Sequence, residues 1–122
     1  RQYLYWDWLE SEAALIETDG CTKVSGFRRQ CCLEHDCAFY YAKDPRDAYR
    51  HYRDSAPQPW MAAQPITFEK ANADFRRCHK QRSRLGSFWW IDPRNVLRWR
   101  GVVRFSRGAW DRHRARERTA AR

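Results

Sequence analysis

The sequence has few glycines and prolines and almost no alternation of β-branched with polar residues. It holds five glycines and five prolines among 122 residues, and its apolar residues often recur at helical spacing instead of the strand period of two. It also has no apolar run of the roughly 18–20 residues that a helix needs to cross a bilayer. These absences argue against a β-sheet fold and a membrane-spanning helix, and they predict a mostly α-helical chain.

Aromatic residues and positive charge, in contrast, are abundant. Seven Trp, six Tyr and six Phe are typical of an ordered chain, and the length fits a single domain over 1–122. The net charge of +9 is unevenly placed, because residues 1–19 carry −4 and residues 94–122 carry +8. A basic, arginine-rich end predicts a polyanionic partner: a lipid surface, nucleic acid, or an acidic face of the same protein. The chain has no recognisable nucleic-acid-binding motif, which favours a lipid surface over nucleic acid.

Helix-start and helix-stop signals divide the chain into segments. We predict helices over five ranges: 3–17, 27–43, 46–53, 67–85 and 93–117. Thr67 is the expected N-cap of the fourth, and residues 55–60 form a connector that contains two prolines. We expect the two long helices, 27–43 and 67–85, to lie antiparallel, with the first and last helices flanking them.

Five cysteines are many for a chain of this length, and their clustering favours an oxidising compartment with one thiol left over. The pairs that suit the helical layout are Cys21–Cys32, which ties a loop to the first long helix, and Cys31–Cys78, which joins the two long helices. Cys37 is then the odd thiol, although spacing alone leaves other connectivities open. We expect a secreted or periplasmic protein. No signal peptide is visible, and the initial Arg in place of Met predicts that the start of the chain is processed or trimmed.

The most specific stretch is the run CCLEHD at residues 31–36. Residues four apart share a helix face, so a disulfide at Cys31 would hold the imidazole of His35 in place, with the carboxylate of Asp36 beside it. A fixed imidazole next to a carboxylate is typical of a general base. Zinc binding by the same cysteines and histidines is the rival interpretation, but adjacent cysteines do not fit the spacing of zinc ligand pairs.

Three segments together resemble the secreted phospholipase A2 superfamily, most closely its prokaryotic branch. They are DGCT at 19–22, CCLEHD at 31–36, and ANADF at 71–75 followed by Cys78, and together they span about 60 residues. The chain departs from the family pattern because Ala38 stands where the family has its next cysteine, with Cys37 one place early. The glycine-rich calcium loop of animal members is also missing.

The resemblance implies calcium-dependent hydrolysis of the sn-2 ester of phospholipids at a membrane surface, as in a secreted toxin or lytic enzyme. His35 would be the base that activates a water molecule. Ca²⁺ would bind the carboxylates of Asp19 and Asp36 and the carbonyl of Gly20, since calcium prefers oxygen ligands.

A residue of the second long helix should orient the imidazole, and the family uses Asp there. Family spacing points to Asn72, whereas Asp74 lies four residues before Cys78 and so mirrors Cys31 and His35. The two candidates lie roughly 200° apart on a helix, so only one can face His35. Asn72 cannot offset the charge of an imidazolium. A second hypothesis is therefore a weakened or inactive lipid-binding module on the same fold, and a third is nucleic-acid binding through the arginine-rich end.

The last predicted helix, 93–117, interleaves aromatic residues with arginines. Trp99 and Trp110, together with Arg100 and Arg104, have the composition of helices that lie at a membrane interface. We therefore predict that they contact an anionic membrane surface. The alternative is a helix that packs on the domain.

Overall fold

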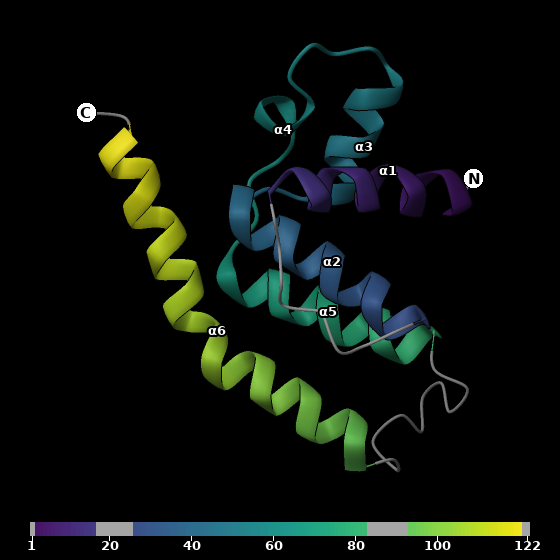
Figure 1. Cartoon of the computed structure of the whole chain (residues 1–122), viewed down its shortest axis with the longest axis vertical. Coiled ribbons are helices and arrows are strands. Elements are labelled where there is room, and N and C mark those ends of the chain that lie inside the picture. The colour runs from purple at the N-terminus through teal and green to yellow at the C-terminus, as the bar shows by residue number, and fades with distance from the viewer. Residues whose placement is uncertain (1, 17–25, 83–92, 121–122) are drawn as a thin grey trace.

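The structure, a computed structural model, describes residues 2–16, 26–82 and 93–120, and these are mostly helical (Figure 1). Its elements are α1 (Gln2–Leu15), α2 (Gly26–Tyr41), α3 (Pro45–Arg53), α4 (Pro59–Ala62), α5 (Phe68–Arg82) and α6 (Pro93–Ala120). Within these ranges no strand occurs, and an isolated bridge joins Lys43 and Pro65. The predicted fold class is confirmed. Among the described helices, none combines the length and the apolarity needed to span a membrane.

Short polar side chains explain where α3 and α5 begin. The carboxylate of Asp44 accepts a hydrogen bond from the Arg46 amide at 3.1 Å, and Pro45 occupies the first turn of α3. The hydroxyl of Thr67 accepts from the Lys70 amide at 3.1 Å, as its predicted capping role requires. The connector predicted over 55–60 is partly helical, because α4 begins at Pro59.

The end of α2 differs from the prediction. The helix stops at Tyr41 instead of residue 43, because Ala42 adopts a φ of 53°, the left-handed conformation that commonly follows a helix C-terminus. The Ala42 carbonyl then accepts a hydrogen bond from the Ile66 amide at 3.0 Å. Glycine is the usual signal for such a stop, and an alanine gives no signal in the sequence.

The two long helices α2 and α5 lie side by side and antiparallel, as predicted (Figure 1). The helices α1 and α3 pack on one side of this pair, and α6 runs obliquely along the other side. Residues of the site therefore come from helices that are far apart in the sequence.

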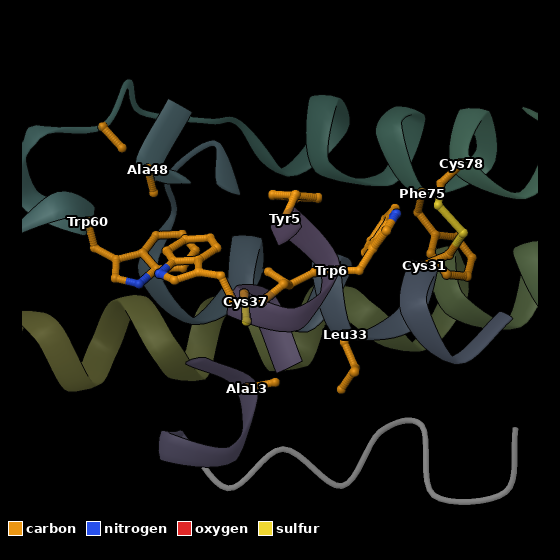
Figure 2. Close-up of a cluster of buried hydrophobic side chains, with 13 residues drawn as sticks. Tyr5, Trp6, Ala13, Cys31, Leu33, Cys37, Ala48, Trp60, Phe75 and Cys78 are labelled. Atoms are coloured by element: carbon orange, nitrogen blue, oxygen red, sulfur yellow. A yellow bond between two sulfur atoms is a disulfide. The ribbon is translucent and has the colours of Figure 1, made fainter. Parts of the chain in front are cut away.

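An aromatic core holds α1 against α2 (Figure 2). The Trp60 ring stacks between two others, with centroid distances of 5.5 Å to Trp8 and 4.2 Å to Tyr41. Its indole N–H donates to the Glu12 carboxylate at 2.6 Å, so the polar edge of this buried ring is satisfied. Because α1 is fixed in this way, its N-terminal half reaches the region of the candidate site.

Candidate active site

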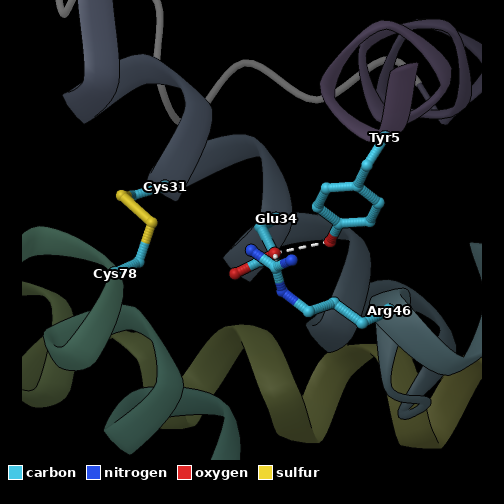
Figure 3. The surroundings of a disulfide bond; sticks show 5 residues. All are labelled: Tyr5, Cys31, Glu34, Arg46 and Cys78. Atoms are coloured by element: carbon cyan, nitrogen blue, oxygen red, sulfur yellow. Dashed lines mark hydrogen bonds and ion pairs between the residues drawn. A yellow bond between two sulfur atoms is a disulfide. The ribbon is translucent and has the colours of Figure 1, made fainter. Parts of the chain in front are cut away.

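A disulfide fixes the two helices that carry the candidate site. Cys31 of α2 and Cys78 of α5 are bonded, with their Cα atoms 5.8 Å apart and a separation of 47 positions in the sequence (Figure 3). This is one of the two predicted disulfides. His35 lies one helical turn after Cys31, so the cross-link limits how far the imidazole can move relative to α5.

The imidazole of His35 is hydrogen-bonded to Asn72 across the two helices. His35 Nε2 lies 2.7 Å from Asn72 Oδ1, and the two residues are 7% and 5% exposed. Because a carboxamide oxygen can only accept, Nε2 carries the hydrogen and the lone pair of neutral His35 is on Nδ1. The rings of Phe39 and Phe75, with centroids 4.2 and 5.0 Å away, hold the imidazole from both helices. The arrangement presets the tautomer that a general base working through Nδ1 requires.

Asp74, the alternative partner of His35, lies elsewhere. Its carboxylate pairs with Lys70 Nζ at 2.8 Å and with the Arg77 guanidinium, both on α5. Of the two candidates that the sequence left open, the structure brings Asn72 to the imidazole. The reason is geometric, since positions 72 and 74 point to different sides of the same helix.

Of the predicted calcium ligands, Asp36 lies near Nδ1 of His35, and the others lie outside the described residues. Asp36 Oδ1 is 3.9 Å from His35 Nδ1, a distance too long for a direct hydrogen bond. Its side chain is 26% exposed and offers the hard oxygen that calcium prefers. Asp19 and Gly20 lie outside the described residues, as does Cys21, so the Cys21–Cys32 disulfide stays a prediction. Within residues 2–16, 26–82 and 93–120, no three His, Cys, Asp or Glu side chains gather as a metal site.

A cavity of about 610 Å³ lies between α2, α3 and α5, and His35 forms part of its wall. That volume is in the usual range for sites that hold small molecules. Apolar side chains and both signs of charge line it: Trp6, Ala38, Ile66, Phe75, Glu34, Asp74, Arg46, Lys70 and Arg77. The imidazole therefore faces a space that could admit part of a substrate.

Glu34 is a buried carboxylate beside His35 that the sequence did not identify as part of the site. Its side chain is 12% exposed and accepts a hydrogen bond from the Tyr5 hydroxyl, while Arg46 Nε lies 3.6 Å away (Figure 3). Burial raises the pKa of the Glu34 carboxyl above its ordinary value, and burial together with the nearby carboxylate raises the pKa of Tyr5. The three residues come from α2, α1 and α3, so no local pattern could have revealed the cluster.

The odd thiol of the predicted disulfide scheme is Cys37. It is fully buried and unbonded within the described residues. Burial raises the pKa of its thiol well above the ordinary range, which keeps it protonated. Cys37 is therefore a packing residue of the core.

The predicted membrane-contact residues of α6 do not all face outward. Trp110 is half-buried and meets Phe39 edge to face at 5.2 Å, and Trp99 packs against the main core. Arg100 and Arg104 are exposed. Both indoles contribute to the packing of α6 on the domain, as the alternative interpretation expects, and their contact with a membrane surface stays a prediction.

No protein-family model, curated protein or solved structure matches the chain. The assignment of a function therefore depends on the geometry of this site and on the sequence resemblance.

Proposed function

We propose that the chain is a phospholipase A2-like hydrolase that cleaves the sn-2 ester of phospholipids, with His35 as the general base. The observation that carries the proposal is the hydrogen bond from His35 Nε2 to Asn72 Oδ1 across the disulfide-linked helix pair. It places the lone pair on Nδ1, and none of the described residues donates a hydrogen bond to that atom. A cavity of suitable size adjoins the ring.

In this mechanism Nδ1 of His35 accepts a proton from a water molecule as the water attacks the ester carbonyl. The dipole of the Asn72 amide stabilises the positive charge that develops on the imidazole, because Asn72 Oδ1 accepts the Nε2 hydrogen bond before and after the proton transfer. The Phe39 and Phe75 rings keep the imidazole from rotating away. General-base catalysis of this kind contributes roughly 10²–10⁴-fold in rate.

The family's calcium ion fits the donor chemistry of Asp36, and Asp19 and the Gly20 carbonyl would complete its protein ligands. When bound, calcium would polarise the ester carbonyl and stabilise its developing negative charge. The basic surface of α6, which includes Arg100 and Arg104, would favour anionic membranes. The disulfide favours an oxidising compartment, so we place the protein outside the cytoplasm, secreted or periplasmic.

The neutral side chain of Asn72 favours a second candidate, a lipid-binding module with weakened catalysis. An amide oxygen stabilises an imidazolium less than a carboxylate does, because it carries only a partial charge. Both candidate functions include binding to a lipid surface, and a measurement of catalytic turnover distinguishes them.

Release of fatty acid from anionic phospholipid vesicles, with calcium or with a chelator, tests the proposal. We expect calcium-dependent release that falls at least about 100-fold in His35→Gln, whose amide can still donate to Asn72. The control His51→Gln changes a histidine of α3 that pairs with Asp47 at 3.6 Å and lies outside the cavity, so its rate should match the parent. Equal release by His35→Gln and the parent would refute the proposal. Vesicle binding without release would support the second candidate.

A further inference from the structure

A second, smaller cluster of apolar side chains packs beside the candidate site. Its buried members are Ala38, Phe39, Ile66 and Ala71, and all of these except Phe39 also line the cavity at His35. Phe39 itself is 4% exposed, and its ring lies against the imidazole of His35 with 4.2 Å between the ring centroids. Because Phe39 stands one turn after His35 on α2, its ring limits one direction in which the imidazole could turn.

The Phe39 ring is held in turn by Trp110 of α6. The two rings meet edge to face, with centroids 5.2 Å apart and planes inclined by 80°. Phe68 of α5 lies 5.8 Å from Phe39 and 6.0 Å from Trp110, so the three rings contact one another. Aromatic contacts of this kind depend on ring orientation, so Trp110 restricts how the Phe39 ring can turn. None of the described residues of α6 lines the cavity at His35, so any effect of Trp110 on the imidazole passes through the rings between them.

The turn of α6 that carries Trp110 is fixed to α2 at the same place. The guanidinium of Arg114, one turn further along α6, lies over the Trp110 ring at 4.7 Å from its centroid. Arg114 Nη2 also donates to the Tyr40 carbonyl at 2.8 Å, directly after Phe39 on α2. A cation–π contact and a hydrogen bond therefore set the position of α6 along α2 one turn away from His35.

We propose that Trp110 is a positioning residue for His35: the indole holds the Phe39 ring, and the Phe39 ring holds the imidazole with Nε2 bonded to Asn72. The effect on the rate rests on the proposed hydrolysis, whereas the orientation of the imidazole is a property of the folded protein without lipid or calcium. A smaller side chain at position 110 would leave space into which the Phe39 ring can move, because a core closes only partly around a new cavity. A catalytic group misplaced by about 1 Å can lose about 100-fold in rate.

Hydrogen exchange at His35 Nε2, measured by NMR without lipid or calcium, tests the orientation directly. In Trp110→Leu we expect exchange at least about tenfold faster than in the parent, because the hydrogen bond to Asn72 opens more often. Trp110→Phe keeps a ring against Phe39 and should stay within about threefold of the parent. The matched control Trp99→Leu makes the same change on α6 at a residue that packs against the main core, and its exchange should also stay within about threefold. Circular dichroism verifies that each variant is folded.

Fatty-acid release from anionic vesicles tests the consequence for catalysis. Trp110→Leu should lower kcat about 10- to 100-fold and leave the half-saturating vesicle concentration unchanged, whereas Trp110→Phe and Trp99→Leu should keep the parental kcat. Phe39→Leu should lower kcat as well, and adding Trp110→Leu to it should cost little more, because both changes act on one contact.

Four results would overturn the proposal. They are parental exchange in folded Trp110→Leu, equally accelerated exchange in Trp99→Leu, accelerated exchange with parental kcat, and a raised half-saturating vesicle concentration with parental kcat. The last result would assign Trp110 to membrane contact instead. If the parent itself released no fatty acid, the hydrolysis proposal would fail, and the exchange comparison would still decide whether Trp110 positions His35.

Discussion

The substitution Asn72→Asp tests the central contact of the site. It replaces the amide nitrogen by a second carboxylate oxygen and keeps the oxygen that accepts from His35 Nε2 at 2.7 Å. The side chain is almost the same size, so the packing of α2 on α5 should be preserved. The charge beside the imidazole changes from zero to −1.

The size of the effect follows from the distance and the burial. With charge centres about 4 Å apart and an effective dielectric of about 20, a carboxylate attracts an imidazolium by about 4 kcal/mol. The amide dipole of Asn72 already supplies part of this stabilisation, so a gain of roughly 2–4 kcal/mol is expected when the proton reaches His35. That corresponds to roughly 30- to 1000-fold in rate. Stability should fall at the same time, because position 72 is 5% exposed and a buried carboxylate loses its hydration.

The assay is calcium-dependent fatty-acid release from anionic vesicles, combined with chemical denaturation of the same preparations. The matched control is Asp47→Asn, the reverse exchange on α3 and outside the cavity at His35. It removes the ion pairs to Arg50 and His51 but no contact with the imidazole of His35. We expect a faster and less stable Asn72→Asp and a control rate within about threefold of the parent. A folded Asn72→Asp with an unchanged rate, while His35→Gln is inactive, would show that no imidazolium forms beside position 72.

Three further predictions concern stability. Loss of the Cys31–Cys78 disulfide in the double alanine variant should lower the free energy of unfolding by about 4 kcal/mol, because the disulfide closes a loop with a sequence separation of 47. Denaturant titration measures this change. A loss below about 1 kcal/mol would contradict the cross-link. Leu9→Ala, at a fully buried position of α1, should lower the free energy of unfolding by about 2–5 kcal/mol. Leu15 is 75% exposed on the same helix, so Leu15→Ala should change that free energy by no more than about 0.5 kcal/mol. Similar losses in both variants would refute the described core. Burial raises the pKa of Glu34 from about 4.5, so the folded state holds this proton more tightly and stability should fall as pH rises from about 4.5 through the folded-state pKa. Urea titrations of Glu34→Gln across that range should lack this fall, and a slope equal to that of the parent would contradict it.

The helices could largely be predicted from the sequence, because periodicity and capping residues act locally. Thr67 caps α5 as expected, and Pro45 occupies the first turn of α3. The end of α2 could not be predicted, since Ala42 takes its left-handed conformation where its carbonyl bonds the distant Ile66 amide. Capping residues and periodicity depend on neighbours in the sequence, so they do not reveal a hydrogen bond between residues 42 and 66.

For the site, the sequence placed His35 on a helix and proposed its disulfide anchor at Cys31. It left Asn72 and Asp74 as alternatives, because helical spacing shows that they point apart but not which one faces α2. Only the packing of α5 against α2 chose Asn72. The chemistry proposed for this pair, including calcium and phospholipid, stays a prediction.

The sequence by itself determined the helical fold class and the cysteine and histidine spacing, because these depend on residues a few positions apart. The tertiary structure alone decided that Glu34 meets Tyr5 and Arg46 from separate helices. It also packed Trp99 of α6 against the main core. An arginine- and tryptophan-rich helix has the same composition whether it faces a membrane or a neighbouring helix, so the face that is buried depends on the partners that the fold supplies.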